Sequence, residues 1–233
     1  MKRNSMHEPL ISVIIPMFNA ERYIAATIQS VFDQRLSPAE IIIVDDGSTD
    51  GSAAIVQTFA PRVRYLHQAN LGPAAARNLG VRQATGDLLA FLDADDLWTA
   101  DKFQRQCAAL IDHPELDAVL GQIENFISPD SARSNQGHRS DPPPVQTGYH
   151  VGALLIRRAA FQRVGGFDET LQSGEFIDWW VRAVEGGLAY RVLPEVVMHR
   201  RWHDHNHTLC RPDTLNDYTR IVRAALARRR AAP

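Results

Sequence analysis

Apolar runs alternate with amphipathic stretches through the first hundred residues of the chain. The runs within ISVIIP (11–16) and AEIIIVDDGSTD (39–50) are continuous and rich in β-branched residues, which is typical of strands buried on both faces. Between them, AERYIAATIQSVFDQ (20–34) places its apolar side chains on one stripe and predicts an amphipathic helix. Similar patterns predict strands over 63–68 and 87–96 and helices over 51–60 and 72–84. This alternation predicts an α/β fold with a mostly parallel, Rossmann-like sheet, flanked by helices and joined by right-handed crossovers.

The second half of the chain has a less regular pattern. Its predicted elements are a helix, a turn and a strand over 103–121, a strand and a short helix over 152–167, a helix over 175–187, an extended segment over 190–203, and a C-terminal helix. The stretch 128–148 is polar and rich in Pro, Ser and Gly, so we expect a long exposed loop there. Since no repeat or linker interrupts the chain, we expect a single domain over 1–233.

Charge and cysteine content narrow the class of protein. The formal net charge is -2 and the pI is near 6.5, so no basic field favours a nucleic acid partner. The two cysteines, Cys107 and Cys210, form no CxxC pair, which argues against a disulfide framework or a thiolate zinc site. No apolar run approaches the roughly 18 residues of a membrane span. We therefore expect a cytoplasmic protein with at most peripheral contact at the inner face of the membrane, where the basic C-terminal helix either touches anionic lipid or is simply solvated.

Three carboxylates crowd the end of the fourth predicted strand, in FLDADDLW (91–98). Because ligands bind beyond the carboxyl ends of parallel strands, we expect residues 16–19, 45–48 and 93–96 to share one rim of the sheet. Like charges this close raise one another's pKa unless a cation lies between them. Carboxylate oxygens suit Mg²⁺ or Mn²⁺. The alternative is a solvated loop in which Asp95 or Asp96 caps the next helix.

Two further groups are predicted at the same rim. Asp45 and Asp46 end the second strand, where a carboxylate can accept hydrogen bonds from a base or a ribose; the alternative is an Asx-type turn with a helix cap. Arg77 could pair with a diphosphate or with the crowded aspartates, or be an ordinary surface arginine. The small residues Ala74 to Ala76 suggest close packing of this helix on the sheet.

Taken together, these segments resemble the family 2 glycosyltransferases. The resemblance is carried by SVIIPMFNAERYIAATIQSVFDQ, EIIIVDDGSTDGS, NLGPAAARNLGVRQATGDLLAFLDADD and GGFDE, in the family's order and at its spacing over roughly residues 10–200. It implies a GT-A fold and an inverting transfer of a sugar from a nucleotide diphosphate sugar, assisted by Mg²⁺ or Mn²⁺. It also implies a nucleotide-sugar-binding half over 10–100 and an acceptor-side half over 101–210, followed by the C-terminal helix over 211–233.

The resemblance implies roles for single residues on the donor side. Pro16 and Phe18 match residues that line the nucleobase pocket, Asp46 matches the aspartate that bonds the base with Asp45 beside it, and Arg77 matches a basic residue on the nucleotide side. Asp93, Ala94 and Asp95 form the DxD element. Asp95 or Asp96 would hold the metal while its neighbours contact the ribose, and His203 or Arg200 would reach the metal or the diphosphate.

The sequence departs from the family pattern at the catalytic base. Many members carry a Glu-Asp pair followed by an aspartate and a tryptophan, whereas this chain reads SGEFIDWWVRA. Glu175 keeps its place and is our predicted base, with Asp178 in reserve, but Phe176 replaces the paired aspartate. The alternative is that both acids merely serve the helix N-terminus, and that the chain is a catalytically silent relative acting as a nucleotide-sugar-binding or regulatory module.

The remaining predictions concern partners. The donor is expected to be a UDP- or GDP-linked sugar, and the acceptor a glycan, a lipid-linked sugar, a peptide or a small molecule. The loop over 128–148 and the pair Trp179 and Trp180 could form its walls, although a tryptophan at helical spacing is more often core. No cysteine or carboxylate triad supports a zinc site among the histidines of MHRRWHDHNHT (198–208). No pattern predicts the oligomeric state.

Overall fold

The computed structural model describes residues 9–129, 131, 143–204 and 214–231. In the first half, the predicted alternation of strands and helices is confirmed by β1 (Ile11–Met17), α1 (Ile24–Phe32), β2 (Glu40–Asp45), α2 (Ser52–Gln57), β3 (Arg64–His67), α3 (Pro73–Gln83) and β4 (Leu88–Phe91). The pairs β1–β2, β1–β4 and β2–β3 are all parallel. Two boundaries differ from the predicted ones. The chain before Ile24 turns, with the Ala20 N–H bonded to the Ser52 hydroxyl at 2.8 Å, and β4 ends before the crowded aspartates.

The second half contains more strands than its sequence pattern predicts. Its elements are β5 (Leu97–Trp98), α4 (Lys102–Asp112), β6 (Ala118–Ile127), β7 (Val145–Thr147), the 3₁₀ helix η2 (Val151–Ala153), β8 (Leu155–Arg157), α5 (Arg158–Val164), α6 (Glu175–Glu185), β9 (Tyr190–Trp202) and α8 (Thr214–Ala231). The short strands β5 and β7 escaped prediction because two or three residues carry no periodicity.

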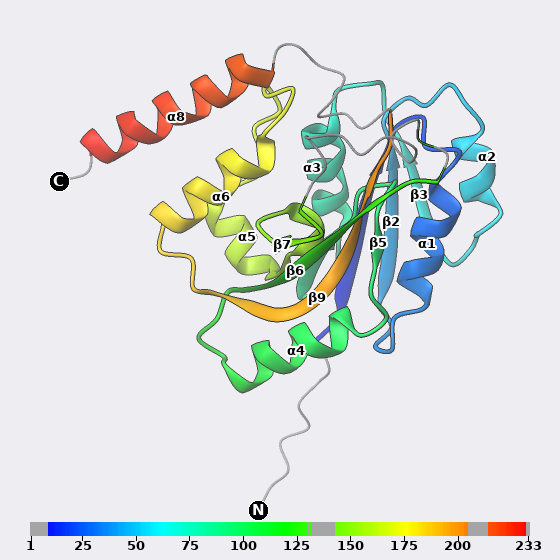
Figure 1. The fold of residues 1–233 in the computed structure, drawn as a ribbon, viewed down its shortest axis with the longest axis horizontal. Helices are drawn as coiled ribbons and strands as arrows, with labels where there is room; N and C mark the ends of the chain where they lie inside the picture. Colours follow the sequence, from blue (N-terminus) through cyan, green and yellow to red (C-terminus); the bar gives the residue numbers. More distant parts are fainter. Residues whose placement is uncertain (1–8, 130, 132–142, 205–213, 232–233) are drawn as a thin grey trace, which may run out of the picture.

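One sheet runs through both halves in the described part of the chain (Figure 1). Its strand order is β3-β2-β1-β4-β8-β6-β9-β5, with β7 paired to β6. β8 joins the halves because it lies antiparallel to both β4 and β6, while the two longest strands, β6 and β9, are parallel to each other. The sheet is therefore parallel at the β3 edge and mixed at the β5 edge. The end of β9 meets the turn that follows β4, where the Arg201 N–H donates to Asp96 at 2.8 Å.

The core lies on both faces of this sheet. Alternate residues of β1 point to opposite sides: Val13 and Ile15 pack with α1, while Ile14 packs with α3, which explains the continuous apolar run in the sequence. α3 lies close to the sheet, as its small residues predicted. The packing is so close that a Cβ at Gly80 would clash with Ile14.

An aromatic cluster attaches α5 and α6 to the sheet. Phe91 of β4 contacts Phe161 and Phe167, with ring centroids 5.7 and 5.6 Å apart, and Trp179 stacks on Phe161 at 5.1 Å. Trp179 is fully buried, and its indole N–H donates to the Gly165 carbonyl at 2.8 Å. The idea that Trp179 lines an acceptor wall is therefore wrong, because its ring belongs to the core.

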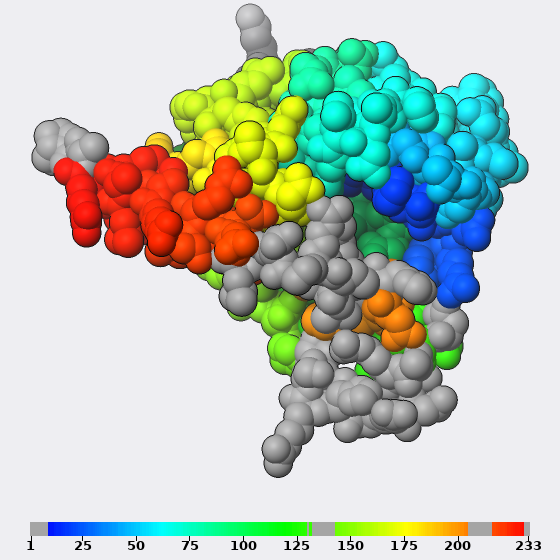
Figure 2. All heavy atoms as spheres, turned by 90° about the horizontal axis from the view of Figure 1, so that it is seen from above, coloured from blue at the N-terminus to red at the C-terminus, as the bar shows by residue number. Residues whose placement is uncertain are grey.

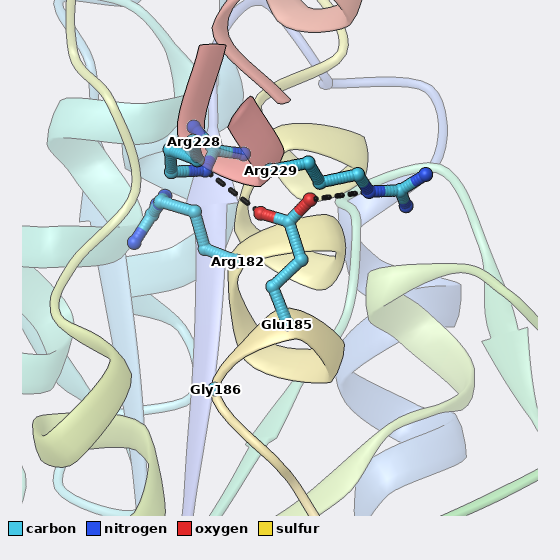
Figure 3. Close-up of a pocket in the computed structure, with 5 residues that line it drawn as sticks. All are labelled: Arg182, Glu185, Gly186, Arg228 and Arg229. Carbon is cyan, nitrogen blue, oxygen red and sulfur yellow. Dashed lines mark hydrogen bonds and ion pairs between the residues drawn. The ribbon is translucent and has the colours of Figure 1, made fainter. Parts of the chain in front are cut away.

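α8 packs along α6 at one side of the molecule, opposite α1 and α2 (Figure 2). Glu185 at the end of α6 accepts hydrogen bonds from Arg228 at 2.8 Å and Arg229 at 3.1 Å (Figure 3). These residues, with Arg182 and Gly186, line a pocket of about 400 Å³. The carboxylate of Glu185 is already paired with two arginines, so we assign this pocket to the packing of α8 on α6. None of the helices in the described ranges has both the length and the apolar composition of a membrane span.

The expected exposed loop over 128–148 falls largely on residues 130 and 132–142, which lie outside the described ranges. Where the chain is described, the expectation is only partly right. Ser128 and Ser131 are buried, and residues 145–147 form β7 against β6.

Candidate active site

The carboxyl ends of β1, β2 and β4 bring together the rim that the sequence predicted. Pro16 and Met17 lie in register with Val44 and Asp45, and the backbone N–H of Leu92 bonds the Ile14 carbonyl at 3.1 Å. Just past β1, Phe18 is 48% exposed. An apolar ring left in solvent at a strand end offers a face on which a planar base could stack.

Asp45 and Asp46 are buried and hold the loops of this rim. The Asp45 carboxylate accepts hydrogen bonds from the Ser48 N–H at 2.8 Å and from the Tyr65 hydroxyl at 2.6 Å. Burial and the neighbouring Asp45 raise the pKa of Tyr65 to about 12, so this hydroxyl stays a donor. The turn role that was part of the alternative for this pair is thus present at Asp45, while at the start of α2 it is Asp50 that accepts from the Ser52 N–H, at 3.0 Å.

Asp46 ties the end of β2 to the start of α3. One of its oxygens accepts from Gln68 Nε2 at 2.7 Å and from the Leu71 N–H at 2.9 Å, and the other accepts from the Gly72 N–H at 2.8 Å. Because a carboxylate oxygen has two lone pairs, one acceptor position remains for a ligand. The contact of Asp46 with a nucleobase stays a prediction.

The acidic segment after β4 folds into a tight turn, with the Asp96 N–H bonded to the Asp93 carbonyl at 3.1 Å. Ala94 is buried, and its carbonyl accepts from the Thr27 hydroxyl at 2.9 Å. Asp96 is only 3% exposed and accepts from the Arg201 N–H at 2.8 Å. Burial, and then the charges of Asp95 and Asp93, raise the pKa of Asp96 well above its usual range. A cation here would relieve that cost.

Asp95 meets His203 across the sheet. The Asp95 Oδ2 and His203 Nε2 atoms are 3.0 Å apart, and the His203 ring packs on Tyr23 with centroids at 4.6 Å. Two neighbouring ligands of an octahedral ion, each at about 2.1 Å, are separated by about 3 Å. In this structure the two atoms share a hydrogen bond, which a divalent ion held by both side chains would replace, and imidazole with carboxylate suits Mn²⁺ better than Mg²⁺.

A second acid and histidine group escaped the sequence analysis. Asp93, Asp96 and His150 each offer a ligand atom, and these atoms lie within 4.8 Å of one another. Burial lowers the pKa of His150 to about 4, despite the opposing effect of Asp93. His150 lies just before η2, and a lone histidine in GYHVG gave no signal that β6 and β8 would bring it to the rim.

Arg77 joins the acidic turn to α6. Its Nη2 atom lies 2.6 Å from Asp93 Oδ1, and its Nη1 atom lies 2.5 Å from Glu175 Oε1. Although burial opposes its charge, Asp93 and Glu175 raise the pKa of Arg77 above its usual range. Burial acts against ionisation of Asp93 as well, but Arg77 and His150 hold the pKa of Asp93 below its usual value. Arg77 is therefore not a surface arginine but a buried link between two acids.

The two predicted bases on α6 have different partners. Glu175 is the first residue of the helix, follows Gly174 with φ of 76°, and faces Arg77. Asp178 instead accepts from Arg182 Nε at 2.8 Å. Phe176, where the family often has an aspartate, is buried with its ring stacked 6.2 Å from Trp179. Its replacement of the aspartate is a packing change that leaves Glu175 at the rim.

The other predicted residues near the end of β9 have different surroundings. His199 pairs with Glu124 at 2.8 Å, while His205 and His207 lie outside the described residues. Arg200 places its guanidinium 5.3 Å from the Trp202 ring, and its charge acts on Asp93 and His150. Of the predicted late residues, His203 is thus the one with a direct contact to the acidic turn.

Comparisons with known proteins identify the class. The fold resembles S. aureus TarS 1-349 in complex with UDP-GlcNAc, with a TM-score of 0.74, 24% identity and coverage of 93% of this chain and 65% of that one. It also resembles the mannosyltransferase PcManGT from Pyrobaculum calidifontis in complex with GDP-Man and Mn²⁺, with a TM-score of 0.70, 20% identity and coverage of 95% and 65%. These likenesses establish a GT-A fold.

The sequence comparisons establish the family. The model of Glycosyl transferase family 2 matches residues 12–169, and the chain belongs to this family of glycosyltransferases. An uncharacterized glycosyltransferase of Rickettsia typhi is 29% identical over 229 residues, covering 94% of this chain and 71% of the relative. EpsJ of Bacillus subtilis is 44% identical over 100 residues, which cover 42% of this chain and 29% of EpsJ.

Proposed function

We propose that the chain transfers a sugar from a UDP- or GDP-linked donor to a hydroxyl of a glycan, a lipid-linked sugar, a peptide or a small molecule, with inversion and with help from Mn²⁺ or Mg²⁺. The observation that carries this proposal is the Arg77 bridge between Asp93 and Glu175. It puts the predicted base beside the predicted donor site, although the two lie 82 positions apart in the sequence. Complexes of TarS with UDP-GlcNAc and of PcManGT with GDP-Man and Mn²⁺ support the donor class.

The donor would lie along the rim. Pro16, Phe18, Asp45 and Asp46 would surround the nucleobase, and Asp93 with Ala94 would lie next to the ribose and sugar. Asp95, Asp96 and His203 would hold the metal, which when bound supplies positive charge to the departing diphosphate. The 3.0 Å spacing of Asp95 and His203 and the raised pKa of Asp96 support this assignment.

Glu175 would take the proton of the acceptor hydroxyl. As the acceptor oxygen bonds to the anomeric carbon, the bond from that carbon to the diphosphate breaks and the proton passes to the carboxylate. Arg77 occupies Oε1, so Oε2 is the oxygen left to receive the proton. An attack from the side of Glu175, opposite the diphosphate, inverts the configuration.

The test is a donor screen followed by stereochemistry. UDP-glucose, UDP-GlcNAc and GDP-mannose are each incubated with the protein and Mn²⁺, and release of the nucleoside diphosphate is measured with and without EDTA. We expect release from at least one donor, its loss in EDTA, and a product of inverted anomeric configuration by NMR. Retention, or full activity in EDTA, would contradict the mechanism. Binding of a donor without any turnover would favour the silent binding module instead.

A further inference from the structure

We propose that Asp93 and His150 together bind one hydroxyl group of the nucleotide sugar, with Asp93 accepting its proton and His150 donating to its oxygen. This inference rests on the proposed function and deepens it. Asp93 was already expected next to the ribose and the sugar, so the new element is His150, which had no role assigned from the sequence.

The first step is the tautomer of His150. The backbone N–H of Gly152 donates to His150 Nδ1 at 3.1 Å, so the lone pair of Nδ1 is occupied. A neutral imidazole carries one proton, which must then be on Nε2. An Nδ1 atom that accepts a hydrogen bond carries no proton, so this contact alone selects the neutral ring. His150 Nε2 is therefore a donor.

The second step is the gap between the two groups. His150 Nε2 and Asp93 Oδ2 are 3.8 Å apart, which is too long for a direct hydrogen bond. An oxygen about 2.8 Å from each atom completes both contacts. The two side chains remain 20% and 27% exposed, so a ligand can reach them.

The third step is the chemical class that fits. An ionised carboxylate only accepts, and this Nε2–H only donates, so the group between them must do both. A hydroxyl does both, whereas a phosphate oxygen would meet the carboxylate with like charge. A metal ion would need the lone pair of Nε2, which carries the proton in the tautomer that the Gly152 N–H selects. In this tautomer His150 acts as a donor and not as a metal ligand.

Both partners are held in place before any ligand arrives. Arg77 fixes Asp93 through Oδ1 at 2.6 Å, which leaves Oδ2 facing His150. η2 is anchored by the indole N–H of Trp98, which donates to the Gly152 carbonyl at 2.7 Å. Such preorganisation lowers the entropy cost of binding.

Two substitutions separate the two nitrogens of the ring. In His150→Asn the side-chain oxygen can still accept from the Gly152 N–H, but no donor reaches the position of Nε2. In His150→Gln the amide N–H reaches that position, but the Nδ1 acceptor is lost. We expect His150→Asn to weaken binding of UDP-glucose, or of GDP-mannose if that is the donor bound, by about 10-fold, and His150→Gln to keep it within about threefold.

The source of the hydroxyl follows from a second ligand. If it belongs to the sugar, the affinity of UDP (or GDP) alone is unchanged in His150→Asn; if it belongs to the ribose, the affinity of the free nucleotide falls by the same factor as that of the nucleotide sugar. Calorimetry gives both constants, and thermal unfolding checks that each variant folds.

Three outcomes would overturn the inference. Equal affinities of wild type and His150→Asn for the nucleotide sugar would remove the contact, as would a larger loss in His150→Gln than in His150→Asn. A loss of Mn²⁺ affinity in both variants, titrated at saturating UDP or GDP, would make His150 a metal ligand. If the wild type binds no nucleotide sugar at all, the proposed function itself fails. The titration of the wild type alone reveals that outcome, so it is distinct from any difference between the wild type and the variants.

Discussion

The two halves of the sheet contribute to the rim in different ways. The parallel half provides acids, because Asp45, Asp46 and the turn over 93–96 all follow strands whose carboxyl ends share one edge. The mixed half provides their partners: His150 before η2, Glu175 at the start of α6 and His203 after β9. The positions of the acids follow from the order of strands along the chain. The positions of their partners depend on packing between elements that are distant in sequence.

This difference divides the proposed roles between the two halves. Acids alone at a strand end would repel one another, and the acids of the turn over 93–96 have partners from other elements. Asp95 faces His203 and Asp93 faces His150. Arg77 pairs with both Asp93 and Glu175 and so links α6 to the same turn. Under the proposed function, a substitution in the mixed half should mainly alter the chemistry, and one in the parallel half should mainly alter binding of the donor and the metal.

The largest effect is expected at Glu175. Glu175→Gln keeps an oxygen for Arg77 but cannot take a proton, so we expect kcat to fall by about 10³-fold with donor affinity within about threefold. Steady-state kinetics and calorimetry measure the two quantities. Glu115→Gln, at an exposed position in the turn between α4 and β6, is the control and should be neutral. If Asp178→Asn lowers kcat far more than Glu175→Gln does, the base is Asp178.

The next effect concerns the aromatic cluster that places α6. Phe176→Asp restores the acid that many family members have there, but it would bury a carboxylate against Trp179, 6.2 Å away in the wild type. We expect the free energy of unfolding to fall by about 3 kcal/mol, measured by urea denaturation. Ile177→Asp, at the adjacent position that is 44% exposed, should cost about 0.5 kcal/mol or less. Similar losses in both variants would mean that Phe176 does not position the helix.

A smaller effect tests whether Asp95 and His203 bind the same metal ion. Asp95→Asn and His203→Gln should each weaken Mn²⁺ binding by about 10–100-fold, measured by electron paramagnetic resonance in saturating UDP or GDP. If both residues hold one ion, the double variant should lose much less than the product of the two single effects. His199→Gln, which disturbs only the pair with Glu124, is the matched control. Fully multiplicative losses would separate the two residues.

The contrast between the halves also explains what the sequence could predict. Apolar runs such as ISVIIP located β1, and the rule for parallel sheets then placed 16–19, 45–48 and 93–96 on one rim. Glu175 could be matched through the family resemblance. The antiparallel entry of β8 between β4 and β6 could not, because three residues carry no register information. His150 was missed for the same reason, since only that topology brings it to Asp93.

The smallest effect concerns a lysine that joins the halves. Lys102 begins α4 and is fully buried, with its Nζ atom 2.5 Å from Gln106 Oε1 and 3.4 Å from the carbonyls of Ala153 and Leu154 beside η2. Burial lowers its pKa from 10.5 to about 7. Between these values the unfolded chain binds one more proton than the folded chain at this site, so the free energy of unfolding rises with pH.

Lys102→Met removes that dependence while filling a similar volume. From pH 7 to pH 8 the wild type should gain about 1 kcal/mol relative to the variant, measured as the difference between urea denaturation curves of the two proteins at each pH. Comparing the two proteins cancels the histidines that titrate in the same interval. A constant difference would mean that the lysine stays charged in the folded protein, and the junction between the halves would then contain a charge stabilised by Gln106, the two carbonyls and the rings of Trp98 and Phe103.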